Sequence, residues 1–171
     1  MVDPQRVLIV TGARALSRTP EARVWALREI VARLDARVTL AHGDCREGPD
    51  LWAWSTARLT ISPIVAFPAY AEPYVTDPDA SVRPLGGAAK YAYKTPLERN
   101  AAMARWAGDM LRRGLDVRAL SLRCGWPFVD GQRATQGTAH ARDHLVRALG
   151  VERVVDLVCP RELGPTMGGG R

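Results

Sequence analysis

The sequence of 171 residues has few of the features that mark secreted, disulfide-bonded or membrane proteins. Its three cysteines, Cys45, Cys124 and Cys159, are far apart, and an odd number without close pairs argues against a disulfide framework. No apolar run approaches the roughly 20 residues that a membrane-spanning helix needs. Residues 1–4 lack the charged and apolar regions of a signal peptide. We therefore expect a cytoplasmic protein that does not enter a membrane.

Metal-ligating residues are sparse as well. His42 and Cys45 lie close in sequence, but no second cluster completes a zinc site. His140 and His144 stand four residues apart on an expected helix, without a carboxylate at a familiar spacing. After Gly12, the second and third glycines of the dinucleotide-binding fingerprint are missing. The sequence therefore predicts neither a bound metal nor a cofactor.

Lysine is almost absent, since Lys90 and Lys94 are the only two, and arginine supplies nearly all of the basic excess. The formal net charge is +6 at pH 7. The planar guanidinium of arginine suits phosphate and carboxylate groups, which favours an anionic ligand or a nucleic acid. The arginines are nevertheless spread along the whole chain, as expected for solvated helix faces in a protein from an arginine-favouring genome. Both interpretations stay open, and the absence of a basic run argues against a nucleic-acid surface.

Short apolar runs alternate with helical patterns along the chain. Strands are expected at Arg6–Val10, Val38–His42, Pro63–Phe67, Val117–Leu122 and Val151–Val158. Helices are expected at Pro20–Leu34, Pro49–Leu59, Pro96–Arg113 and Gly137–Leu149. This order predicts an α/β fold, a Rossmann-like three-layer sandwich with a mainly parallel sheet of five or more strands. We expect one domain over residues 1–163 and a flexible tail over residues 164–171.

Two of the expected helices have a recognisable N-terminal capping sequence. Thr19 precedes Pro20 as an N-cap, and Thr95 with Glu98 forms a capping box before the third helix. In the first helix, the face expected to be buried carries Val24, Leu27, Val31 and Leu34.

The segment Tyr70–Lys94 lacks a clear periodicity and is expected to be irregular. Such a long connection is uncommon in a compact domain, so it is either a functional lid or a disordered insertion. Disordered segments are usually poor in aromatic residues, and this one contains four tyrosines. The lid is therefore the favoured interpretation, and the tyrosines concerned are Tyr70, Tyr74, Tyr91 and Tyr93.

Residues suited to an anionic ligand follow several of the expected strands. Glycine allows a close backbone approach, amides at a helix start point outward, and arginine pairs with phosphate. Each turn taken alone has an ordinary structural explanation, because glycine-rich turns, capping aspartates and surface arginines are common. Ligands of parallel sheets bind at the carboxyl ends of the strands, where these turns meet. We therefore expect a site made of Gly12, Ala13, Arg14, Gly43, Asp44, Asp50, Arg99, Asn100, Arg133, Gly137 and Thr138.

The order of these motifs resembles the SLOG superfamily of Rossmann-like nucleotide-binding proteins, nearest to its YspA-like bacterial and phage members of uncharacterised function. The resemblance extends from Arg6 to about Val158. It rests on Val10–Arg14, Gly43–Asp44 with Gly48–Asp50, Phe67–Ala69, Arg99–Asn100 with Met103, and Gln136–Thr138. It implies a nucleotide-binding domain whose ligand lies at the carboxyl edge of the sheet.

The Lonely Guy phosphoribohydrolases of the same superfamily add an implied enzyme function. Arg99–Met103 resembles their Arg-Lys-x-x-Met motif, and Gly137–Ala141 resembles the end of their glycine-rich motif. The resemblance places Arg99 and Gly137–Thr138 around phosphate and ribose, but Ala141 stands where these enzymes keep a catalytic glutamate. Alanine can neither stabilise a developing positive charge nor activate water. Asp44, Asp50 or Asp130 could substitute from other turns.

We therefore expect a protein that binds a nucleotide or nucleotide-derived ligand through phosphate. The alternative is a nucleotide N-glycosidase, with Arg99, Asp44 and Asp130 as candidate catalytic residues. A third possibility is the binding of single-stranded nucleic acid. We also expect a homodimer, because Lonely-Guy-like relatives are commonly dimeric and because a small core offers little room for all of Trp52, Trp106 and Trp126.

Overall fold

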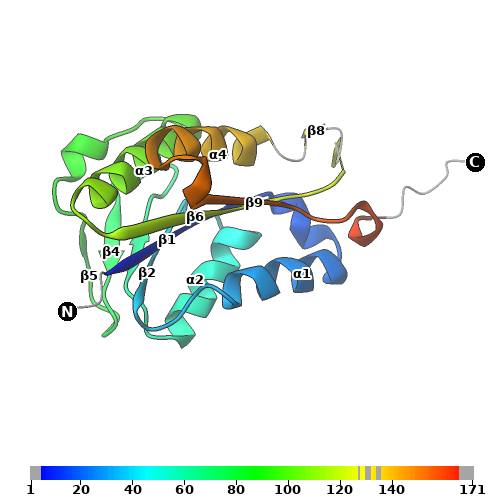
Figure 1. Cartoon of the computed structure of the whole chain (residues 1–171), viewed down its shortest axis with the longest axis horizontal. Helices are drawn as coiled ribbons and strands as arrows, with labels where there is room; N and C mark the ends of the chain where they lie inside the picture. Colours follow the sequence, from blue (N-terminus) through cyan, green and yellow to red (C-terminus); the bar gives the residue numbers. More distant parts are fainter. Residues whose placement is uncertain (1–4, 127, 130–131, 134–135, 166–171) are drawn as a thin grey trace, which may run out of the picture.

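The computed structural model describes residues 5–126, 128–129, 132–133 and 136–165, and within them the fold is α/β with a mostly parallel sheet (Figure 1). This sheet has seven strands in the order β5-β4-β3-β2-β1-β6-β9. Its parallel strands are β1 (Arg6–Gly12), β2 (Val38–His42), β3 (Ile64–Ala66), β6 (Asp116–Arg123) and β9 (Val154–Val158). The prediction of an α/β fold with at least five mainly parallel strands is confirmed.

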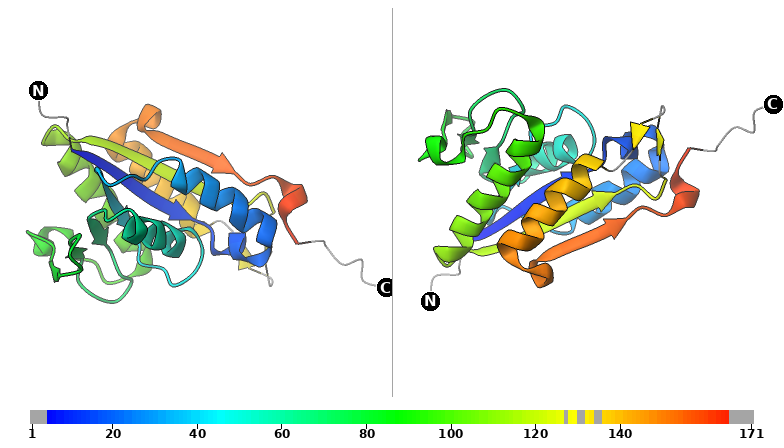
Figure 2. Two further views of the ribbon diagram at one scale, coloured as in Figure 1. Left: turned by 90° about the horizontal axis from the view of Figure 1, so that it is seen from below. Right: turned by 90° about the horizontal axis from the view of Figure 1, so that it is seen from above.

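Four α-helices flank the sheet, two on each side. They are α1 (Pro20–Val31), α2 (Pro49–Leu59), α3 (Pro96–Arg112) and α4 (Gln136–Leu149). Figures 1 and 2 show α1 and α2 on one side of the sheet and α3 and α4 on the other. The side chains of β1 alternate accordingly: Leu8 and Val10 pack in the cluster beneath α1 and α2, and Val7 and Ile9 in the cluster beneath α3 and α4. The central strand is thus buried on both faces.

The buried face of α1 differs from the predicted one. Val24 and Val31 are 48% and 56% exposed, whereas Ala22, Ala26 and Ile30 are fully buried. The small alanine side chains form the stripe that packs on the sheet, and the larger valines point to solvent. The apolar periodicity was therefore wrong for Val24 and Val31, whereas Leu34 is buried and Leu27 packs partly buried against the same cluster. Both expected N-caps form: Thr19 accepts from the amide of Ala22, and Thr95 from that of Glu98.

The segment Tyr70–Lys94 is not irregular throughout, which corrects the prediction. It contains β4 (Tyr74–Thr76), antiparallel to β3, and β5 (Val82–Pro84), antiparallel to β4, followed by the 3₁₀ helix η2 (Ala88–Tyr91). Strands of three residues are too short to show an alternating pattern, and backbone pairing of β4 with β3 and of β5 with β4 stabilises them instead. The segment therefore extends the sheet by two strands.

Further differences from the expected elements lie in the C-terminal part of the chain. Residues Val151–Arg153 form the 3₁₀ helix η3, so the last strand begins at Val154. The expected loop between β6 and α4 contains the short antiparallel pair β7 (Phe128–Val129) and β8 (Gln132–Arg133). Two further 3₁₀ helices are η1 (Arg14–Arg18) and η4 (Arg161–Leu163). Most of the expected tail, residues 166–171, lies outside the described residues.

One chain accommodates the three tryptophans that were expected to crowd its core. Trp52, Trp106 and Trp126 are only 6%, 4% and 9% exposed, divided between the clusters on the two faces of the sheet. The packing argument for a homodimer was therefore wrong. Within the described ranges, no helix has the length and apolarity needed to cross a bilayer, and no group of three or more His, Cys, Asp or Glu side chains could hold a metal ion.

Candidate functional site

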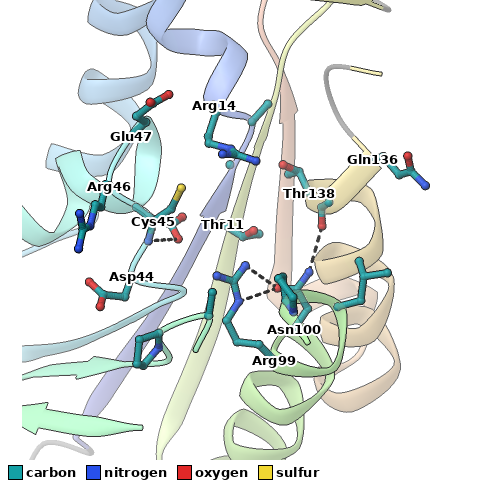
Figure 3. A pocket seen from close by; sticks show the side chains of 18 of the residues that line it. Thr11, Arg14, Asp44, Cys45, Arg46, Glu47, Arg99, Asn100, Gln136 and Thr138 are labelled. Atoms are coloured by element: carbon teal, nitrogen blue, oxygen red, sulfur yellow. Dashed lines mark hydrogen bonds between the residues drawn. The ribbon is translucent and has the colours of Figure 1, made fainter. Parts of the chain in front are cut away.

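An open cleft of about 980 Å³ lies at the carboxyl edge of the parallel strands (Figure 3). Strand β1 lies between β2 and β6, so the chain order of the strands reverses there, and ligands of open α/β sheets bind beside such reversals. The cleft is lined by residues that follow β1, β2 and β3 and by the first turns of α3 and α4, namely Thr11–Ala15, Arg18, Asp44–Glu47, Asp50, Pro68–Ala71, Pro96, Leu97, Arg99, Asn100 and Gln136–Thr138.

Most residues of the predicted site line this cleft. They are Gly12, Ala13, Arg14, Asp44, Asp50, Arg99, Asn100, Gly137 and Thr138. Gly43 lies in the adjacent turn and contacts Arg99 through its carbonyl oxygen. Asp130 and the side chain of Arg133 lie outside what the structure describes, so their expected part in the site stays a prediction.

Several lining residues were missed from the sequence. Arg18, Cys45, Arg46 and Glu47 belong to the same turns as the predicted residues, so their position after a strand could have indicated them. Pro68 and Ala69 follow β3 and belong to a motif that carries the sequence resemblance, and Tyr70 and Ala71 begin the segment expected to form a lid, although none of the four was named as a site residue.

Arg99, Asn100 and Gly137 connect three elements of the cleft wall. The Arg99 Nη1 donates to the carbonyl oxygen of Gly43 at 2.7 Å, while its Nε and Nη2 donate to the Asn100 Oδ1 at 3.3 and 3.1 Å. The Asn100 Nδ2 in turn donates to the carbonyl oxygen of Gly137 at 3.2 Å. Asn100 is only 4% exposed, so these hydrogen bonds tie the starts of α3 and α4 to the turn after β2.

Two carboxyl groups share the cleft in different environments. Asp50, in the first turn of α2, is 6% exposed, and burial raises its pKa to about 6, although the nearby Arg99 guanidinium opposes that rise. Its Oδ2 accepts a long hydrogen bond of 3.4 Å from the Cys45 amide. Asp44 is half-buried, and burial likewise raises its pKa, against a 3.3 Å hydrogen bond from the Tyr74 hydroxyl. Asp50 can therefore change its charge near neutral pH.

A buried histidine supports the turn that carries Asp44. The Asp44 amide donates to the His42 Nδ1 at 3.0 Å, which places the ring proton on Nε2. That Nε2 is buried and has no hydrogen-bond partner among the described residues. Burial, reinforced by the Arg99 charge, lowers the pKa of His42 to about 4, so the ring is neutral. Asp44 itself has a left-handed φ of 52°, a conformation that aspartate tolerates better than most residues.

The glycines of the site differ in what surrounds them. A Cβ on Gly12 would lie 2.2 Å from the Pro49 Cγ, so this glycine allows β1 to approach the start of α2. That differs from the expected approach of the backbone to a ligand. A Cβ on Gly43 would lie 2.9 Å from the Asp50 Oδ2 and 3.0 Å from the Arg99 Cζ. Only Gly137 of these three faces open space, since nothing lies within 4 Å of its added Cβ.

The charges around the cleft are mostly basic. Four arginines line it, Arg14, Arg18, Arg46 and Arg99, against the three carboxyl groups of Asp44, Glu47 and Asp50. Neither Arg14 nor Arg46 makes a hydrogen bond or close ion pair with another described residue, although the Arg46 charge acts to lower the pKa of Asp44. Figure 3 shows Arg14 and Arg99 entering from separate elements, η1 and α3. The guanidinium groups of Arg14 and Arg46 are thus available to an anion.

Ala141, where the resembling enzymes keep a glutamate, does not line the cleft. It lies one turn after Gly137 in α4 and is 1% exposed. The carboxyl groups that do line the cleft come from the turn after β2 and from the first turn of α2.

Tyrosines attach the segment Tyr70–Lys94 to the body of the domain. The Tyr74 hydroxyl donates to Asp44, the Tyr93 hydroxyl to the carbonyl oxygen of Pro68 at 2.7 Å, and the Tyr91 hydroxyl to Asp109 at 2.6 Å. Of this segment, Tyr70 and Ala71 line the cleft. The segment thus borders the cleft at its first residues.

No protein-family model and no curated protein sequence matches this chain.

Proposed function

We propose that the cleft binds a nucleotide or nucleotide-derived ligand through its phosphate groups. The observation that carries the proposal is the pair of guanidinium groups, Arg14 and Arg46, that line the cleft without an ion-pair partner in the described chain. Arginine is the side chain best suited to phosphate, because its planar fork presents paired donors.

The helix ends support the same ligand class. The first turns of α3 and α4 both line the cleft, but α3 is capped by Thr95 and carries Glu98, whereas the first turn of α4 carries no acidic residue. The helix dipole favours an anion at the start of α4. The open face of Gly137 leaves room for a phosphate to approach the backbone of α4.

The arrangement of the strands supports a Rossmann-like three-layer sandwich of the SLOG type. The parallel strands have the order β3-β2-β1-β6-β9, with the reversal at β1 beside the cleft. In folds of this class, nucleotides bind at that reversal. The proposed ligand therefore agrees with the sequence resemblance.

Calorimetric titration with adenosine and guanosine monophosphates and with ribose 5-phosphate tests the proposal. Hydrogen bonds to charged groups contribute about 1.5–3 kcal/mol, so Arg14→Gln is expected to weaken binding about 10- to 150-fold. Arg58→Gln, in the last turn of α2, is a matched control that should bind like the wild type. No binding of any of these phosphates, or equal binding by both variants, would contradict the proposal.

A second candidate function is hydrolysis of the N-glycosidic bond, in which water adds to the ribose C1′ and the base leaves with a proton. Asp50 favours it, because a buried carboxyl with a pKa of about 6 suits a general acid or base. Since the cleft lacks a carboxylate at Ala141, we expect little or no release of free base. Robust release that Asp50→Asn abolishes would make the protein an enzyme.

A further inference from the structure

A second, smaller pocket adjoins the cleft. Its volume is about 290 Å³, and it is lined by Tyr70, Ala71, Glu72, Pro73, Ala88, Ala89, Ala92 and Tyr93. Tyr70 and Ala71 line both hollows, so they form the wall between them. The two pockets therefore meet at Tyr70 and Ala71.

Hydrogen bonds within the protein hold the walls of the smaller pocket together. The Tyr93 hydroxyl donates to the carbonyl oxygen of Pro68, which links the wall that contains Tyr93 to the segment that carries Tyr70. The Leu85 amide donates to the carbonyl oxygen of Pro73 at 3.0 Å. Tyr91, beside the lining alanines, is anchored on Asp109. Because these contacts lie within the protein itself, the walls of the pocket need little ordering on binding.

The two hollows differ in chemistry. The cleft is lined by four arginines and three carboxyl groups, whereas the smaller pocket has no basic residue and Glu72 is its single charged one. Only the cleft offers guanidinium groups to a phosphate, so an anionic ligand has its phosphate in the cleft and its uncharged part toward the smaller pocket. The remaining walls are alanines, a proline and two tyrosine rings, which suit a flat apolar group.

Tyr70 is the residue placed to recognise that group. The residue is 86% exposed, although tyrosine usually buries much of its ring. It lines both the basic cleft and the smaller pocket, and exposed aromatic rings of this kind can stack on nucleobases. An exposed tyrosine with no described hydrogen bond contributes little to the fold, so its removal leaves the domain intact.

We propose that Tyr70 and the smaller pocket bind the aromatic base of the ligand, so that the protein selects nucleotides over sugar phosphates and inorganic phosphates. This inference rests on the proposed function, because the phosphate must lie among the arginines of the cleft for the base to reach Tyr70. It makes Tyr70 a specificity-determining residue that contacts the ligand.

The test compares ribose 5-phosphate with adenosine and guanosine monophosphates in calorimetric titrations of the wild type and Tyr70→Ala. The wild type should bind at least one nucleotide more tightly than ribose 5-phosphate. Tyr70→Ala should weaken that nucleotide about 5- to 150-fold, the range measured for single base–aromatic stacks, and leave ribose 5-phosphate unchanged. Tyr70→Phe keeps the ring and should bind like the wild type.

Two further variants separate stacking from general damage. Ala92→Trp places a large side chain at an exposed position of the smaller pocket and should weaken the nucleotide alone. Trp54→Ala removes a partly exposed aromatic ring from α2, outside both hollows, and should change neither affinity. Melting temperatures of all variants should match the wild type.

Each contrary outcome has a distinct meaning. If nucleotides and ribose 5-phosphate bind equally well, the base pocket is overturned while the phosphate site stands. Equal weakening of both ligands by Tyr70→Ala overturns it as well. If none of the phosphates binds, the inference and the proposed function fail together.

Discussion

The guanidinium of Arg99 is bound to the backbone of Gly43, 56 residues earlier in the chain, with 2.7 Å between Nη1 and the carbonyl oxygen. Its other nitrogens face the Asn100 Oδ1. Arg99 therefore holds the cleft wall together as well as adding positive charge to it. In this it differs from Arg14, which has no described partner.

This difference predicts separate effects for the two arginines. Arg99→Ala removes the donor to the Gly43 carbonyl oxygen and to the buried Asn100 Oδ1. This loss should lower the free energy of unfolding by about 1–3 kcal/mol. For a chain of this size, each kcal/mol lowers the melting temperature by about 2–4 °C. Arg14→Ala should leave the melting temperature unchanged and weaken phosphate binding alone. Circular dichroism melting curves check both, and an unaltered Arg99→Ala curve would contradict the structural role.

His42 predicts a loss of stability on acidification. Its pKa is about 4 in the folded protein and near 6.5 in the unfolded chain, so the unfolded chain binds the proton more readily. Stability is therefore present above pH 6.5 and falls as the pH drops from 6.5 toward 4. His42→Asn keeps an acceptor for the Asp44 amide but does not titrate, so the unfolding free energy of the wild type should fall by about 2 kcal/mol relative to this variant between pH 7.5 and 5.

Urea unfolding at both pH values measures the difference between His42→Asn and the wild type. Because every other titrating group is common to the two proteins, their contributions cancel. A difference that does not change with pH would show that His42 is not held neutral by the fold.

Asp50 contributes a pH dependence of stability opposite to that of His42. Its pKa is raised from 3.8 to about 6 by burial, so the folded state holds the proton more tightly than the unfolded chain. This contribution favours folding below pH 3.8 and is lost as the pH rises through 6. Asp50→Asn should therefore be more stable than the wild type at pH 8, by up to about 3 kcal/mol, with most of the difference gone at pH 4. Chemical denaturation at the two pH values provides the measurement.

Much of the fold and the cleft could be predicted because strong local signals follow the strands. Arg6–Val10 is a mainly apolar run that Gly12 follows two residues later, and the turn Gly43–Asp50 combines glycine, proline and aspartate. Strand direction then brings both turns to one edge of the sheet. Most of the predicted cleft residues followed from this argument alone.

What could not be predicted depends on contacts between distant residues. The buried stripe of α1 is made of Ala22 and Ala26 with Ile30, and a face of small residues gives little apolar periodicity. Strand β4 owes its pairing to β3, and its three residues carry no pattern of their own. The bond from Tyr74 to Asp44 likewise joins two elements whose approach only the folded sheet determines.

The last prediction concerns Gly12, where any larger side chain would clash with Pro49. A Cβ there would lie 2.2 Å from the Pro49 Cγ and 2.5 Å from the Pro49 Cβ, and a proline ring cannot rotate away. Gly12→Ala therefore pushes α2 from β1, and overpacking of this kind costs about 1–3 kcal/mol. Gly137→Ala is the matched control, since nothing lies within 4 Å of its added Cβ and alanine is the better helix former.

Thermal unfolding should show a lower melting temperature for Gly12→Ala and an equal or higher one for Gly137→Ala. The double variant Gly12→Ala with Pro49→Gly removes both the Cγ and the Cβ that the new methyl group would meet, so it should recover most of the loss. Pro49→Gly alone measures the cost of losing proline at the first position of α2, which the cycle subtracts. Additive losses in this double-mutant cycle would show that the clash with Pro49 is not the cause, whereas a coupling of about 1 kcal/mol or more identifies Gly12 as the residue that lets α2 begin beside the cleft.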